Sequence, residues 1–217
     1  SFNTLSLFSS LFSVTPFITP CRDNDIVCLK ASAQRAIPVL SAGVPEFGIG
    51  SLDPMLMDQV KTITTMKDDC MIKGLQRAGS RTYFDILCSV DMVGDYTLSG
   101  NLLVMPIEGK VTVCDMILDG EKLEQVNEFR SVNGDNYWTV KSWKHTSEVQ
   151  KGVHFQFQNL FNGNKKLAGA VTKFANENWR EIFQEVAPPI VKAIVAQIIE
   201  EINKLFDAVP IKEMVLE

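Results

Sequence analysis

The chain has 217 residues, and 21 Lys and Arg against 26 Asp and Glu give it a formal net charge of −5 at pH 7. Hydrophobic residues make up 46% and charged residues 22%, a balance that excludes a wholly disordered chain. The acidic balance argues against a nucleic-acid partner, because a nucleic-acid groove needs clustered Lys and Arg. Five cysteines and two histidines leave little material for a metal centre, and we expect no cofactor.

Residues 1–20 carry no charged side chain and contain four of the thirteen phenylalanines. Pro16 and Pro20 make this stretch a poor transmembrane span. We expect an apolar N-terminal arm that packs on the body or plugs a groove, followed by a single domain over 21–217. An exposed tail is the alternative for the arm.

Cys21 and Cys28 bracket the start of the first predicted helix, whose apolar residues recur at helical spacing from Ile26 to Leu40 and which ends at Gly43. Two cysteines at this spacing fit a disulfide better than a zinc site. In the chain-entropy model such a short bridge contributes about 2.5 kcal/mol of stability. Two free thiols are the alternative.

Strand patterns occupy the region from about Met55 to Gln158. Apolar and polar residues alternate from Phe84 to Met92 and again from Val153 to Gln158. A two-residue period predicts strands with one buried and one solvated face, which is typical of antiparallel sheet.

The last fifty residues are predicted to be helical, beginning near Lys165. Their apolar stripe becomes two rows wide after Pro189, which indicates a deeply buried helix. Pro188 should kink this helix or split it in two. An unbroken helix to Val209 would be roughly 65 Å long, against about 44 Å for the diameter of a compact domain of this size. The helix therefore folds back at Pro188, or the molecule is elongated.

Enzyme signatures such as G-x-S-x-G, H-E-x-x-H and the phosphate-binding glycine loops are absent from the sequence. Glu200 and Glu201 are predicted to lie solvated on the polar side of the last helix. Cys88 is in phase with an apolar strand face, where a thiol behaves as a small hydrophobe. We therefore expect no enzyme, with a hydrolase as an alternative.

The segment from Asn159 to Leu167, which contains Leu-Phe-Asn-Gly-Asn, precedes a long helix that carries Asn176-Glu177-Asn178-Trp179. These motifs resemble the takeout and juvenile hormone-binding proteins of insects, and supporting matches run from the Cys21 pair to Val209-Pro210. The hormone-binding branch has a second disulfide that reaches its C-terminal helix. This chain has no cysteine after Cys114, so the takeout branch is favoured.

The resemblance implies an α+β fold in which a long C-terminal helix is wrapped by a strongly curved antiparallel sheet. It also implies an elongated shape and an internal apolar tunnel for a lipophilic molecule such as a terpenoid hormone, a fatty acid or a quinone-like lipid. The function it implies is that of a secreted, non-enzymatic carrier. We expect a monomer without stable membrane insertion. A membrane-active lipid-transfer module that uses the arm, and an interaction domain with a solid core, are the alternatives.

The resemblance supplies no ligand motif at residue level, so periodicity selects the tunnel wall. The predicted ligand-binding residues are Ile37, Leu40, Phe84, Ile86, Val104, Phe155, Phe157, Val171, Phe174, Ile190, Ile194 and Ile198. Candidate polar anchors are Tyr83, Tyr96 and Thr172. One disulfide among Cys70, Cys88 and Cys114 is conceivable and would leave one thiol.

Overall fold

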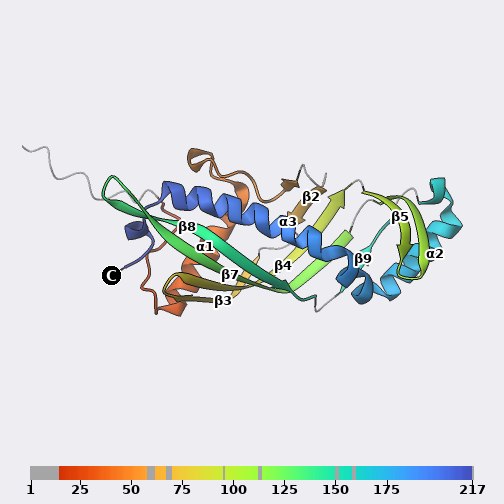
Figure 1. Ribbon diagram of the computed structural model, residues 1–217, viewed down its shortest axis with the longest axis horizontal. Coiled ribbons are helices and arrows are strands. Elements are labelled where there is room, and N and C mark those ends of the chain that lie inside the picture. Colours follow the sequence, from red (N-terminus) through yellow and green to blue (C-terminus); the bar gives the residue numbers. More distant parts are fainter. Residues whose placement is uncertain are drawn as a thin grey trace, which may run out of the picture.

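The computed structural model describes residues 15–57, 62–66, 70–94, 96–111, 114–149, 152–157 and 160–216. The molecule is elongated, and one long helix, α3 (Trp179–Ala208), runs along it (Figure 1). Residues 1–14, most of the predicted arm, lie outside the described residues. At the end of that arm, Phe17 and Ile18 pack against a buried cluster of the body.

The helices begin and end at capping residues that the sequence offers. Besides α3, the helical elements are α1 (Ile26–Ala42), η1 (Pro45–Phe47), η2 (Phe161–Gly163), α2 (Lys165–Glu177) and η3 (Ile211–Glu213). The Asp25 carboxylate accepts a hydrogen bond from the backbone N–H of Cys28 at 2.9 Å and so caps α1. Gly43, at φ 90°, ends the same helix, and Asn164 caps α2.

The strands form one antiparallel sheet and a separate hairpin. They are β1 (Met55–Met57), β2 (Thr62–Met66), β3 (Met71–Ala78), β4 (Arg81–Gly94), β5 (Tyr96–Leu102), β6 (Met105–Val111), β7 (Cys114–Val132), β8 (Asp135–Ser147) and β9 (Val153–Phe155). The sheet order is β1-β2-β4-β7-β8, with β3 also paired to β4 and β9 to β7, while β5 pairs with β6 alone. The long central strands twist beside α3 (Figure 1), which confirms the predicted α+β class.

The break in the C-terminal helical region lies at Asn178, not at Pro188. Asn178 separates α2 from α3, and α3 continues through Pro188 and Pro189. Of the two outcomes predicted for Pro188, a kink or a split, the split is therefore wrong. Both prolines are exposed, as are Gln184 and Glu185, whose carbonyls lose their helical donors. Water can reach those carbonyls, so the two missing hydrogen bonds do not end the helix.

Three buried clusters share α3 along its length. Near α2, Ile182 and Ile194 belong to a large cluster with Phe155 of β9. Farther along, Val191, Val195 and Ile199 pack with Leu123 of β7, and Leu205 and Phe206 pack with Trp138 of β8. By length and composition α3 would also suit a membrane span, a test that core helices of soluble proteins pass as well. Its buried residues belong to all three clusters, and this places α3 at the core of the fold.

Candidate functional site: an apolar cavity beside α1

A cavity of about 270 Å³ lies between α1, the sheet and the C-terminal half of α3. Its wall is mainly apolar and is drawn from both ends of the chain and from five strands, β2, β3, β4, β7 and β8. The lining residues are Ile18, Thr19, Leu29, Ser32, Ala33, Ala36, Ile37, Leu40, Ser41, Ile49, Leu52, Met66, Cys70, Ile72, Leu75, Arg77, Thr82, Phe84, Ile86, Leu123, Gln125, Asn127, Trp138, Ile198, Glu201, Ile202, Leu205, Phe206 and Met214.

Small side chains on α1 leave this space open. Ser32, Ala33 and Ala36 line the cavity from the same face of the helix as Leu29 and Leu40. The helix packs on β3, where Ala33 contacts the cluster that contains Ile72 and Leu75. Larger side chains at these small positions would fill more of the space that the cavity occupies.

The sheet contributes an apolar row to the opposite wall. Leu75 of β3 pairs with Phe84 of β4, which pairs in turn with Leu123 of β7. Residues that pair directly across antiparallel strands share one face of the sheet, so these three side chains present a continuous apolar strip to the cavity. Phe84, which strand periodicity selected as a predicted wall residue, lies in this strip.

Glu201 is the one carboxylate among the described lining residues, and its side chain is only 5% exposed. It accepts hydrogen bonds from Gly50 N at 2.8 Å, Lys204 Nζ at 2.8 Å and Gln197 Nε2 at 3.0 Å. Burial raises the pKa of Glu201, but these bonds, that from Lys204 foremost, outweigh it and lower the pKa. The prediction of a solvated Glu201 is wrong, because this carboxylate ties the loop at Gly50 to α3.

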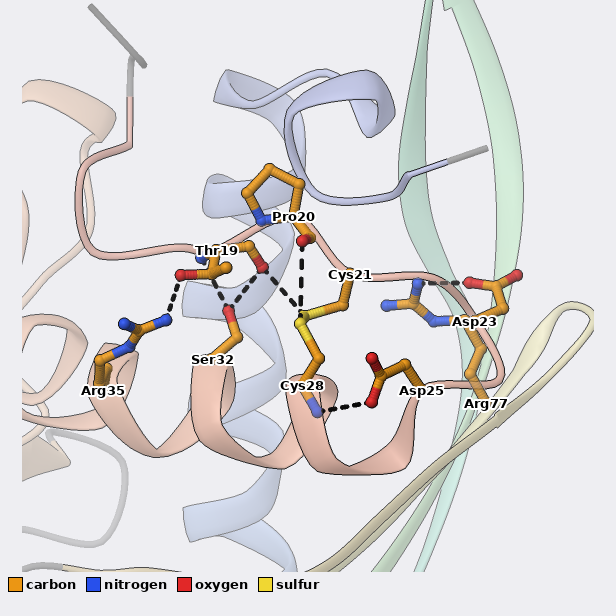
Figure 2. Close-up of a disulfide and its surroundings, with 9 residues drawn as sticks. All are labelled: Thr19, Pro20, Cys21, Asp23, Asp25, Cys28, Ser32, Arg35 and Arg77. Carbon is orange, nitrogen blue, oxygen red and sulfur yellow. Dashed lines mark hydrogen bonds and ion pairs between the residues drawn. A yellow bond between two sulfur atoms is a disulfide. The ribbon is translucent and has the colours of Figure 1, made fainter.

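The first disulfide fixes the segment before α1 to the first turn of this helix. Cys21 and Cys28 are bonded, which confirms the predicted pair, and Figure 2 shows Cys28 on the helix and Cys21 on the segment above it. The Ser32 hydroxyl accepts a bond from Thr19 N at 2.8 Å and donates to Thr19 O at 2.9 Å. The segment that holds Thr19, itself a lining residue, is thereby fixed to α1.

A second disulfide joins Cys70 to Cys88, with Cα atoms 4.5 Å apart. It is the one pair that the sequence left open among the three remaining cysteines, so Cys88 is a disulfide partner and not a thiol that packs as a small hydrophobe. Cys114 is left over, and its side chain lies outside the described residues. Cys70 lines the cavity, so this bond fixes part of the wall to β4.

Comparison with known proteins agrees with this architecture. The model of the haemolymph juvenile hormone binding protein family matches residues 3–75 and 68–216. The chain belongs to this family. A solved structure, Takeout 1 of Epiphyas postvittana, has a similar fold. Its sequence is 24% identical to this chain, and the TM-score is 0.86. The match covers 92% of this chain and 100% of the Takeout 1 chain.

Curated relatives in the juvenile hormone binding protein family carry a circadian name. The chain is 24% identical over 221 residues to the circadian clock-controlled protein daywake of Drosophila melanogaster, covering 89% of this chain and 85% of the relative. Daywake of Drosophila yakuba is 22% identical over 202 residues, covering 80% and 77%. Both alignments span most of each protein, so the similarity concerns the whole domain.

The cavity of this family member contains five of the predicted ligand-binding residues: Ile37, Leu40, Phe84, Ile86 and Ile198. Six others belong to or pack against the cluster at the α2 end: Phe155, Phe157, Val171, Phe174, Ile190 and Ile194. Val104 lies in the turn between β5 and β6 and is 85% exposed, so its assignment to a strand facing the tunnel is wrong. Alternation does not continue through a hairpin turn.

None of the predicted polar anchors with described side chains lines the cavity. Tyr83 is 37% exposed, and the Thr172 hydroxyl donates to the Ala168 carbonyl within α2. The side chain of Tyr96 lies outside the described residues. The polar residues at the cavity are instead Arg77, Thr82, Gln125 and Asn127, besides Glu201 and the small hydroxyls of α1 and its flanks. Gln125 and Asn127 are two residues apart on β7, a spacing that could have indicated one shared face.

Proposed function

We propose that this protein is a secreted carrier that binds one elongated lipophilic molecule in the cavity beside α1. Residues 21–217 act as a single ligand-binding unit in this proposal. The observation that carries it is an open space with an apolar wall, in a fold whose other end holds the packed apolar cluster around Phe155. Membership of a family named for hormone binding supports the same conclusion.

Burial of the ligand's apolar surface supplies the affinity. At about 25 cal/mol per Å², a chain-like molecule that loses roughly 400 Å² to the wall gains on the order of 10 kcal/mol before the costs of association. Among the described residues, no group of three or more His, Cys, Asp or Glu could hold a metal ion. The proposed role is binding and transport without chemical change, which the family's description as a binding protein supports.

Two disulfides support an extracellular location, because such bonds persist in oxidising compartments. The word haemolymph in the family's description supports the same location. The monomeric state stays a prediction, which sedimentation of the purified protein will measure.

The test is native mass spectrometry of the purified protein, followed by denaturation and organic extraction. We expect a mass excess that disappears on denaturation and is recovered as a lipid, or uptake of an added fluorescent apolar probe, N-phenyl-1-naphthylamine. No mass excess together with no uptake of the probe would mean a solid core and would overturn the carrier proposal.

A matched pair of variants locates the site. Ala36→Trp places an indole in the cavity and should abolish uptake of the probe, because Ala36 lines the wall. Ala31→Trp adds the same group to the exposed side of α1 and should leave uptake unchanged. Equal binding by the two variants would place the ligand elsewhere.

Flotation with liposomes separates a carrier, which stays in solution, from a membrane-active module.

A further inference from the structure

Four polar side chains at one end of the cavity have buried atoms without a hydrogen-bond partner among the described residues. These atoms are Arg77 Nε, Thr82 Oγ1, Gln125 Oε1 and Asn127 Oδ1. The exposed fractions of Thr82, Gln125 and Asn127 are 3%, 1% and 6%. All four residues line the cavity. Buried polar groups in folded proteins are normally paired, so four together point to a partner that occupies the cavity.

Strand register brings these groups together. Arg77 of β3 pairs with Thr82 of β4, and Thr82 pairs with Gln125 of β7. Directly paired residues have Cβ atoms about 5 Å apart. Asn127 follows Gln125 on the same face of β7, since side chains alternate along a strand.

The adjacent row along the same strands is apolar throughout. It consists of Leu75, Phe84 and Leu123, two residues from Arg77, Thr82 and Gln125 respectively. Two residues of a strand span about 7 Å. The wall therefore changes from apolar to polar within one step, as a site for a chain with one polar end requires.

The charge of Arg77 is already balanced. Its Nη1 lies 2.8 Å from a carboxylate oxygen of Asp23, an ion pair drawn in Figure 2, and its guanidinium carbon lies 4.2 Å from the centre of the Trp138 ring. These contacts hold the guanidinium in place and leave its Nε–H as a fixed donor. The Glu201 carboxylate is likewise balanced, because Lys204 Nζ lies 2.8 Å from one of its oxygens. Arg77 and Glu201 therefore leave no unbalanced charge for an ionised ligand. A neutral end group suits this environment better than an anion does.

We propose that the cavity selects an apolar, chain-like molecule that ends in a neutral hydroxyl group. The hydroxyl oxygen accepts hydrogen bonds from Arg77 Nε–H and the Thr82 hydroxyl, and its proton is donated to Gln125 Oε1, since Gln125 pairs directly with Thr82 across the strands. This inference rests on the proposed carrier function and names the chemical class of its ligand. An ester or ether end accepts but cannot donate, and would leave the Gln125 oxygen unpaired.

The test compares two ligands that differ in the ability to donate a hydrogen bond, because a methyl group replaces the hydroxyl proton in one of them. 1-Tetradecanol and methyl tetradecyl ether are each titrated into wild-type protein that holds N-phenyl-1-naphthylamine. Displacement of this probe is measured by the change in its fluorescence. We expect the alcohol to displace the probe at a concentration about tenfold lower than the ether, the factor for one hydrogen bond worth about 1.4 kcal/mol. Tetradecanoate at pH 8 should compete less well than the alcohol.

Three variants assign the preference to residues. Gln125→Met removes an acceptor and should weaken binding of the alcohol alone. The ratio of the displacing concentration of the ether to that of the alcohol should then fall several-fold. Thr82→Val removes a donor and should lower the affinity for both ligands by the same factor, so the ratio of the two displacing concentrations stays unchanged. Thr64→Val, a buried threonine of β2 that does not line the cavity, is the control and should change neither ligand. Probe binding by each variant shows that it has folded.

Failure of the inference is distinguishable from failure of the proposed function. If the probe binds but alcohol and ether compete equally, or the ratio survives Gln125→Met, the hydroxyl proposal is overturned and the carrier remains. Stronger competition by tetradecanoate would also overturn it, since the site would then prefer an anion. If the probe does not bind at all, both proposals fall.

Discussion

Replacement of Glu201 by glutamine tests how the cavity wall is held together. The substitution keeps the shape of the side chain but converts one acceptor oxygen into an NH₂ donor. Glu201 accepts from Gly50 N through one oxygen and from Lys204 and Gln197 through the other. In Glu201→Gln, one of these sets of donors therefore faces another donor.

The magnitude follows from the contacts that are lost. A hydrogen bond to a charged group contributes about 1.5–3 kcal/mol, and a buried donor left without an acceptor costs about 1–3 kcal/mol. Since the Glu201 side chain is 5% exposed, water does not replace these contacts. We expect the free energy of unfolding at pH 7 to fall by about 2–4 kcal/mol. Glu200→Gln is the control, because Glu200 is 64% exposed and lies 3.8 Å from Lys204.

The difference between wild type and Glu201→Gln should depend on pH. The pKa of Glu201 in the folded protein is below its ordinary value of 4.5, so its ionised form stabilises the fold above that pH. Protonation of the wild-type carboxylate removes this stabilisation as the pH falls through the folded pKa. Urea unfolding at pH 7, 5 and 3.5, followed by circular dichroism, should show the difference shrinking at the lowest pH. A difference below about 0.5 kcal/mol at pH 7, equal to that of the Glu200 control, would refute the reasoning.

Other substitutions separate the cavity from the rest of the molecule. Cys70→Ala with Cys88→Ala should lower the unfolding free energy by about 3 kcal/mol in the chain-entropy model and weaken probe binding, since Cys70 lines the wall; unchanged urea midpoints would contradict this. Phe155→Ala should lower stability by about 3–5 kcal/mol without changing probe affinity, and loss of probe binding by a folded variant would extend the site to β9. Val104→Asp should leave stability within about 0.5 kcal/mol and binding unchanged, because Val104 is 85% exposed.

Much of the fold could be predicted because local patterns and tertiary packing agree. The cap at Asp25, the stop at Gly43 and the strand alternation around Phe84 lead to the elements observed. The position of the helix break could not be predicted from the sequence. The expectation that proline interrupts a helix takes no account of whether water can reach the carbonyls that lose their backbone donors. Pro188 lies on an exposed face, where water serves those groups. The break at Asn178 carries no proline or glycine to indicate it.

The cavity was only partly predictable. Periodicity shows which face of an element points inward, but not whether the space it meets is filled. Phe84 and Phe155 have the same strand signal, yet the first borders a cavity and the second lies in a packed cluster. Small residues on the inward face of α1, Ala33 and Ala36, were the informative signal. Their effect depends on the distance between α1 and the sheet, which no local pattern supplies.

The pairing of the two ends of the chain bears on the order of folding. The backbones of Cys21 and Val215 pair in an isolated parallel β-bridge, and Leu216 N donates a hydrogen bond to Cys21 O at 3.0 Å. Closing a loop of roughly 200 residues costs about 5 kcal/mol of chain entropy, so contacts of such long range form late. Thr19 and Met214, which flank this bridge, both line the cavity. The binding space should therefore be completed in the final step of folding, and partly folded chains would not retain a ligand.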